Sequence, residues 1–227
     1  MPSLSQLLTD HGDLLVLDAA STQLQAGLFR RDATGTWRTT PQEAGRGLFD
    51  CTRELLADAQ LRVVDIGAFI YCEGPGSMLG IRTIAMALRT WQILKQRPVF
   101  AYRSLTLAGY FEWSQKSPRE FAVLADARRD TWHRQIVQAD GQLPPLQRVS
   151  AAELGDGEWV TPENFRAWST PPRPAKTCCY DLAKIFPVLK NADLFRQTET
   201  PDAFQHEAPE YKKSPAKIHS IETADRK

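Results

Sequence analysis

The residues that can catalyse a reaction or hold a metal are few and scattered in this sequence. Its four histidines are His11, His133, His206 and His219, and no two of them lie one helical turn apart. A helix needs that spacing to present two imidazoles to one metal ion. We therefore predict no metal site and no catalytic residues, and we interpret His133, beside Trp132 on a predicted strand, as a half-buried structural residue.

The cysteines indicate a reducing compartment. Cys51, Cys72, Cys178 and Cys179 form no C-x-x-C pair, so neither a disulfide framework nor a zinc site is predicted. The longest apolar stretch, 66–72, is too short to cross a membrane, and the N-terminal sequence lacks the basic start and long apolar run of a signal peptide. The predicted localisation is cytoplasmic.

The most informative segment is a glycine-rich turn between a predicted strand and a predicted helix. Gly74 and Gly76 permit backbone angles closed to other residues. Pro75 stiffens the bend between them, and Ser77 can cap the helix. Gly80 lets another backbone or a ligand approach closely. Free amides at such a helix start can hold an anion, but we favour a role in backbone geometry alone. Arg82 lies where the helix dipole repels it, so it is predicted to pair with a carboxylate, with Glu73 as one candidate. The motif residues are Gly74, Pro75, Gly76, Ser77, Gly80 and Arg82.

A nucleotide site of the usual kind is not predicted. The last two glycines, Gly155 and Gly157, lie among acidic residues that would repel a phosphate. Asp18, after the first strand, is interpreted as a turn-former or as the vestige of a nucleotide site, in preference to a metal ligand. Ser21 and Thr22 have no nearby histidine to activate their hydroxyls. We expect no cofactor.

The elements that must position these residues follow from hydrophobic periodicity. Predicted strands cover 14–17, 24–30, the region of Trp37, 66–72 and 99–102, and predicted helices cover 47–59, 77–96 and 104–115, the last capped by Ser104. This order predicts an α/β fold with a mixed sheet covered by helices. A second unit begins near Pro118, with strands at 121–125 and 131–137 and a short helix at 181–189.

We therefore divide the chain into three parts. An N-terminal lobe covers 13–116, a smaller C-terminal lobe covers 117–200, and a polar tail covers 201–227, with a loose leader over 1–12. The basic residues of the tail are interleaved with acids and are predicted to be solvated.

The long predicted helix has two apolar faces. At 100° per residue, one face carries Ile81, Ile84, Ala85, Leu88 and Trp91 and should pack on the sheet. The opposite face carries Leu79, Met86 and Ile93, where a surface helix should be polar. Coverage by another part of the same chain is possible, but we favour a partner subunit. Leu48 and Cys51 on the preceding helix are predicted to share this interface.

Charge argues against a protein that wraps nucleic acid by itself. The chain has 227 residues and a formal net charge of +1, with 42% hydrophobic and 24% charged residues. A nucleic-acid binder normally carries a clear basic excess.

Three segments in register resemble the TsaB (YeaZ) family. The Gly-Pro-Gly-Ser-x-x-Gly-x-Arg turn matches the family motif, with Met78 and Leu79 replacing a Phe and a Thr. Residues 15–22 resemble its opening strand and turn, and residues 125–132 resemble the Asp-Ala-Arg hairpin that begins its second lobe. Pro209-Glu210-Tyr211 weakly resembles its C-terminal ending.

This resemblance implies an ASKHA-type (actin, sugar kinase, Hsp70-like) fold of two lobes and a non-catalytic subunit. Such subunits pair, through helices of the N-terminal lobe, with a TsaD-like enzyme that transfers threonylcarbamoyl to the tRNA adenosine next to the anticodon. A TsaE-like ATPase joins them, the same helices can form a homodimer, and tRNA is reached only through the complex. Two alternatives stay open: an active ATP-dependent ASKHA enzyme, and a diverged binding module with another partner.

Overall fold

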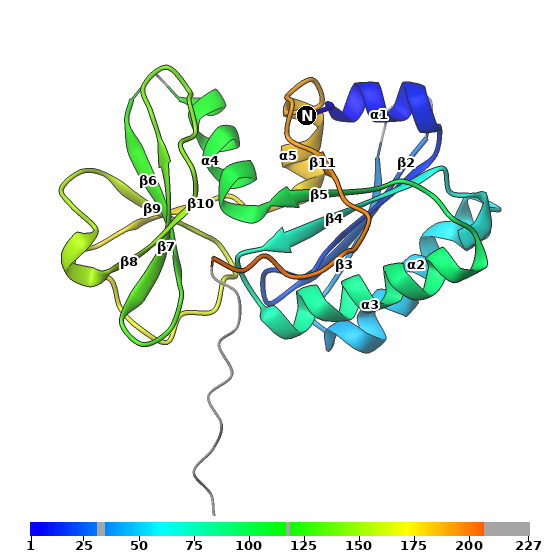
Figure 1. Cartoon of the computed structure of the whole chain (residues 1–227), viewed down its shortest axis with the longest axis horizontal. Helices are drawn as coiled ribbons and strands as arrows, with labels where there is room; N and C mark the ends of the chain where they lie inside the picture. Colours follow the sequence, from blue (N-terminus) through cyan, green and yellow to red (C-terminus); the bar gives the residue numbers. More distant parts are fainter. Residues whose placement is uncertain (31–34, 117–118, 207–227) are drawn as a thin grey trace, which may run out of the picture.

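Two lobes, each built on one sheet, lie side by side in the computed structural model (Figure 1). The structure describes residues 1–30, 35–116 and 119–206. The predicted Pro209-Glu210-Tyr211 ending and the basic part of the tail lie outside these residues.

The first lobe holds a six-stranded mixed sheet in the order β11-β5-β4-β1-β2-β3. Its strands are β1 (Leu14–Asp18), β2 (Leu24–Phe29), β3 (Thr36–Thr40), β4 (Ala68–Gly74), β5 (Val99–Arg103) and β11 (Arg196–Gln197). β1 pairs antiparallel with β2 and parallel with β4. Every residue of β1 is buried, as expected of an apolar run without alternation that is covered on both faces. The predicted mixed sheet is confirmed.

Helices cover both faces of this sheet. On one face lie α2 (Ala44–Asp58) and α3 (Met78–Leu94), and on the other lie α1 (Leu4–His11) and α5 (Leu182–Val188) (Figure 1). The short 3-10 helix Val63–Asp65 precedes β4. Each face has its own cluster of buried apolar side chains.

The loose leader predicted over 1–12 is wrong. Ser3 and Gln6 form a capping box that begins α1, which satisfies backbone amides at the helix start. Leu4, Leu7 and Leu8 are buried in the core, so hydrophobic packing stabilises a helix too short to persist alone.

The second lobe holds a five-stranded sheet in the order β10-β9-β6-β7-β8. Its strands are β6 (Phe121–Asp126), β7 (Thr131–Val137), β8 (Gln147–Ser150), β9 (Trp159–Pro162) and β10 (Lys176–Cys178). α4 (Ser104–Gln115) packs on β6 and β7, and the 3-10 helix Ala151–Glu153 follows β8. Ser104 is the first residue of α4 and not its cap; its hydroxyl donates to the Pro75 carbonyl.

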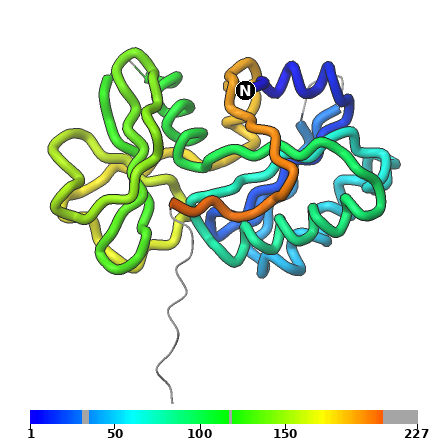
Figure 2. The backbone as a smooth tube through the Cα atoms, in the orientation of Figure 1, coloured from blue at the N-terminus to red at the C-terminus, as the bar shows by residue number. Residues whose placement is uncertain are grey.

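The predicted boundary of the C-terminal lobe at residue 200 is also wrong. α5 packs in the first lobe, and β11 pairs with β5 of the first sheet. Residues 201–206 are not a free tail: Ala203 is buried, and the Phe204 amide donates to the Glu73 carbonyl at 2.7 Å. In Figure 2 this last described segment crosses the first lobe and ends where the lobes meet.

Candidate functional site

The glycine-rich turn presses against the loop that follows β1. A Cβ on Gly76 would lie 2.4 Å from the Ala20 carbonyl oxygen, and a Cβ on Gly80 would lie 2.4 Å from that of Ala19. The Ser77 amide donates to the Ala20 carbonyl at 2.7 Å, while its hydroxyl accepts from the Gly80 amide at 3.4 Å. Ser77 is therefore the predicted cap. Because a backbone carbonyl takes the Ser77 amide, the geometry favours an architectural role over an anion site.

The predicted pairing of Arg82 with Glu73 is wrong. Glu73 is buried, and its carboxylate pairs with Arg103 at 3.3 Å and with Arg196 at 2.6 Å. Arg82 is exposed on α3 and makes no ion pair within the described part of the chain. It therefore stays available on the same surface as Leu79 and Met86, with which it lines a shallow groove.

Asp18 is the centre of a buried polar cluster. Its Oδ1 accepts from the Ala20 amide at 2.8 Å, which confirms the turn-forming role. Its Oδ2 accepts from the Tyr102 hydroxyl at 2.6 Å and from the Tyr180 hydroxyl at 2.7 Å. Burial raises the pKa of the Asp18 carboxyl, against the opposing effect of these hydrogen bonds.

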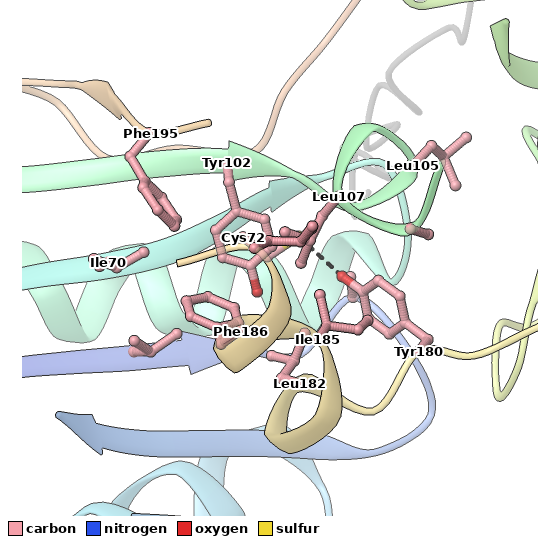
Figure 3. Packing of buried hydrophobic residues seen from close by; sticks show 14 of the residues in the cluster. Ile70, Cys72, Tyr102, Leu105, Leu107, Tyr180, Leu182, Ile185, Phe186 and Phe195 are labelled. Atoms are coloured by element: carbon pink, nitrogen blue, oxygen red, sulfur yellow. Dashed lines mark hydrogen bonds between the residues drawn. The ribbon is translucent and has the colours of Figure 1, made fainter. Parts of the chain in front are cut away.

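The two tyrosines come from distant parts of the chain. Tyr102 lies on β5 and Tyr180 follows β10, and in Figure 3 both reach into one apolar cluster, with the Tyr180 hydroxyl 3.7 Å from the Cys72 sulfur. No local pattern marks either as a partner of Asp18, so sequence reasoning missed them. Together they occupy Asp18 Oδ2, while the Ala20 amide occupies Oδ1.

A second missed contact joins two histidines. His133 Nδ1 lies 2.9 Å from His206 Nε2, and the rings stack with centroids 5.1 Å apart. Burial first, and then the charge of His206, lowers the pKa of His133 to about 4. His133 is half-buried, as predicted. Within 1–30, 35–116 and 119–206, no three His, Cys, Asp or Glu side chains are arranged to hold a metal ion.

The thiols are unsuited to nucleophilic chemistry. All four cysteines are free, and burial raises the pKa of each, that of Cys178 to about 12. A raised pKa keeps a thiol protonated, and the thiolate is the reactive form.

The outward face of α3 is apolar and exposed. Leu79, Met86 and Ile93 are 71%, 58% and 84% exposed, so no other described part of the chain covers them. Thr83 and Thr90 donate their hydroxyls to the carbonyls of Leu79 and Met86. Because these hydroxyls are satisfied within the helix, the threonines add little polarity between the apolar side chains.

Leu48 and Cys51 do not belong to this surface, and their assignment to the interface is corrected. Both are buried beneath α2, where they pack against the sheet. The large apolar residue that α2 exposes is Phe49, which is 53% exposed and stacks edge-on against Trp91 at 6.3 Å. Neighbouring positions of a helix point 100° apart, so Phe49 faces outward while Leu48 faces the sheet.

We define the α2–α3 face as Phe49, Leu79, Met86 and Ile93 with the groove between them. Phe49, Leu79 and Met86 line that groove together with Thr83. The structure thus places three predicted residues on one surface and adds a fourth from the neighbouring helix.

Comparison with known proteins shows the fold. No protein-family profile and no curated protein matches the sequence. YeaZ from Pseudomonas aeruginosa matches in structure with a TM-score of 0.60 at 18% identity, over 78% of this chain and 90% of that one. A Pseudomonas aeruginosa protein described as similar to peptidase YeaZ matches with a TM-score of 0.58 at 19% identity, over 73% and 83% of the two chains.

The chain therefore has a YeaZ-like fold, and the predicted α/β class, with two lobes of mixed sheet flanked by helices, is confirmed. In the described residues, no helix is both long and apolar enough to traverse a bilayer.

Proposed function

We propose that this chain is a non-catalytic, TsaB-like subunit of a complex that transfers threonylcarbamoyl to tRNA, and that it binds a TsaD-like enzyme through its α2–α3 face. The observation that carries this proposal is the exposure of Leu79, Met86 and Ile93 on one side of a helix whose other side is core. The YeaZ-like fold supports it.

The energetics of the α2–α3 face favour association. Full burial of one large apolar side chain contributes roughly 1.5–3 kcal/mol. More than half of the surface of each of four apolar side chains is exposed to solvent: Phe49, Leu79, Met86 and Ile93. A partner that covered them would remove much of this apolar surface from water. Arg82 at the edge can give such an interface a charged rim, which is where interfaces usually carry polar groups.

The buried polar groups support a non-catalytic role. Both oxygens of Asp18 accept hydrogen bonds from protein donors, and burial raises the pKa of the four thiols, which favours their unreactive protonated form. In this proposal the TsaD-like subunit supplies the chemistry, a TsaE-like ATPase joins the pair, tRNA is met in the complex, and the assembly is cytoplasmic. The same face can form a homodimer when the partner is scarce.

The test is co-expression with the TsaD-like protein of the same organism, followed by affinity purification and light scattering. We expect a stable heterodimer with the natural chain and its loss with the double variant Met86→Asp/Ile93→Asp. Val188→Asp, at an exposed apolar position on α5 (49% exposed), is the matched control and should leave pairing intact.

Circular dichroism of each variant separates lost pairing from lost folding. Because both α3 residues are exposed, the double variant should keep the melting curve of the natural chain. A folded double variant that still co-purifies would refute the proposed interface. Heat release on mixing the chain alone with magnesium and ATP at micromolar affinity would favour the enzyme alternative instead.

A further inference from the structure

The tip of the second lobe gathers exposed basic side chains around an exposed tryptophan. We define the arginine cluster as Arg128, Arg129, Arg148, Arg166 and Trp168, all of them exposed. Trp168 is 60% exposed, in a chain whose formal net charge is only +1. One exposed aromatic side chain is ordinary on a protein surface, so it is the arginines gathered around Trp168 that distinguish this surface.

Hydrogen bonds hold three segments together at this tip. Asp126, at the end of β6, accepts from the backbone amides of Trp168 and Ser169, the first at 2.7 Å. Arg148, on β8, donates to the Thr131 hydroxyl at 3.1 Å and to the Ala127 carbonyl at 3.3 Å. The cluster is thus a built surface and not a chance meeting of mobile side chains.

The arginines are not neutralised by the protein. Across 1–30, 35–116 and 119–206, none of the four forms an ion pair, whereas Arg38 and Arg119 each pair with two carboxylates. The acids at the tip are Asp126, which accepts backbone amides, and the exposed Asp130.

The backbone of the turn between β6 and β7 is held in an uncommon conformation. Arg128, Arg129 and Asp130 have φ of 65°, 53° and 54°. Left-handed backbone costs an L-residue roughly 1–2 kcal/mol relative to the right-handed form. Two arginines at positions that suit glycine indicate that their side chains serve a purpose that outweighs this cost.

The aromatic part offers a stacking platform. The Arg128 guanidinium lies 4.5 Å from the centre of the Trp168 ring. A planar guanidinium on an indole presents a flat, positive surface, and both groups stack on nucleic-acid bases. Arginines around such a platform suit phosphate groups, which they can bind through two donors at once.

We propose that the arginine cluster binds RNA at an unpaired loop, with Arg129, Arg148 and Arg166 on phosphates and a base stacked at the Arg128–Trp168 pair. This inference goes beyond the proposed pairing through the α2–α3 face and does not depend on it. A cluster of this size gives a weak, salt-dependent contact, which is consistent with the near-neutral charge of the whole chain.

Fluorescence anisotropy of the full chain with a labelled RNA stem-loop tests the proposal. We expect binding that weakens as potassium chloride rises from about 50 to about 200 mM. Arg129→Glu/Arg166→Glu should weaken binding about tenfold and flatten the salt dependence, because each lost phosphate contact reduces the slope by about 0.7–0.9. Trp168→Ala should weaken binding about fivefold or more with little change in that slope. Arg46→Glu/Arg53→Glu on α2 makes the same charge change elsewhere and should leave binding unchanged.

Arg129→Gly distinguishes a binding role from a structural one. Glycine accepts a φ of 53° without cost, so this variant should melt at the same or a higher temperature while it binds RNA less tightly. RNA binding that is insensitive to Arg129→Gly, Arg129→Glu/Arg166→Glu and Trp168→Ala would overturn the proposal. Binding of a polyglutamate peptide to the arginine cluster, without any binding of RNA, would also overturn the proposal. That result would assign the surface to an acidic protein.

Discussion

At the scale of single residues, the buried hydroxyls around Asp18 are the contacts with the clearest energetic consequence. Removal of one partner of a buried hydrogen bond costs about 1–3 kcal/mol, because the other partner is left unsatisfied. Tyr180→Phe removes one donor from Asp18 Oδ2 without changing the volume of the ring. We expect Tyr180→Phe to lower the free energy of unfolding by about 2 kcal/mol in urea titrations.

Tyr110→Phe is the control for that experiment. Tyr110 is half-buried on α4 against Trp113, and within the described residues its hydroxyl makes no hydrogen bond. Its loss should change stability by less than about 0.5 kcal/mol. An equal effect of both variants would show that the Asp18 cluster contributes nothing specific.

The stacked histidines predict how stability depends on pH. The pKa of His133 in the folded chain is lowered to about 4 from an ordinary value of 6.5. Between these values the unfolded chain binds more protons than the folded one, so stability is full above about pH 6.5 and falls as the pH drops toward 4. The loss through this group is at most about 3 kcal/mol.

The groups that face His133 are His206, Arg148 and Asp126, of which only Asp126 favours its protonated form. His133→Gln removes the titration and should flatten the stability profile between pH 6.5 and 4.5, as measured by urea unfolding at each pH. A profile of unchanged slope in His133→Gln would assign the pH dependence to other groups.

At the scale of elements, the start of α3 shows what a glycine can be required for. A Cβ on Gly80 would meet the Ala19 carbonyl oxygen at 2.4 Å, and backbone cannot move aside cheaply. Gly80→Ala should therefore destabilise the chain by about 1–3 kcal/mol. Gly45, in the first turn of α2, has only the Glu43 side chain within 4 Å, at 3.9 Å. Gly45→Ala should stabilise the chain by about 0.5–1 kcal/mol, and calorimetry of both variants should show melting shifts of opposite sign.

Elements were predictable where their signal is local. The unbroken apolar run of β1, the strand–turn–helix at Gly76 and the two faces of α3 are all written in consecutive residues. The failures have a different cause. α1 forms because three leucines meet the core, and the Tyr180 hydroxyl reaches Asp18 across 162 positions of sequence. Such contacts depend on tertiary packing, for which a single sequence carries no local signal.

At the scale of the whole molecule, residues 201–206 connect the two lobes. Phe204 donates its amide to Glu73 in the first lobe and lies beneath the Arg103 guanidinium at 4.1 Å. Two residues later, His206 contacts Phe204 and stacks on His133 of the second lobe. The Thr22 amide and the Asn164 carbonyl, 2.7 Å apart, form another link between the lobes.

Phe204→Ala should weaken this connection as well as the local packing. Truncation of a buried phenylalanine costs about 3–5 kcal/mol, and Phe204 is only partly buried, so we expect roughly half of that. Because the segment joins the lobes, urea unfolding should also become less cooperative, with tryptophan fluorescence and far-ultraviolet circular dichroism changing at different midpoints. Gln205→Ala, at an exposed position of the same segment, should leave both midpoints coincident. Coincident midpoints in Phe204→Ala would show that other contacts, such as that between Thr22 and Asn164, hold the lobes together without help from this segment.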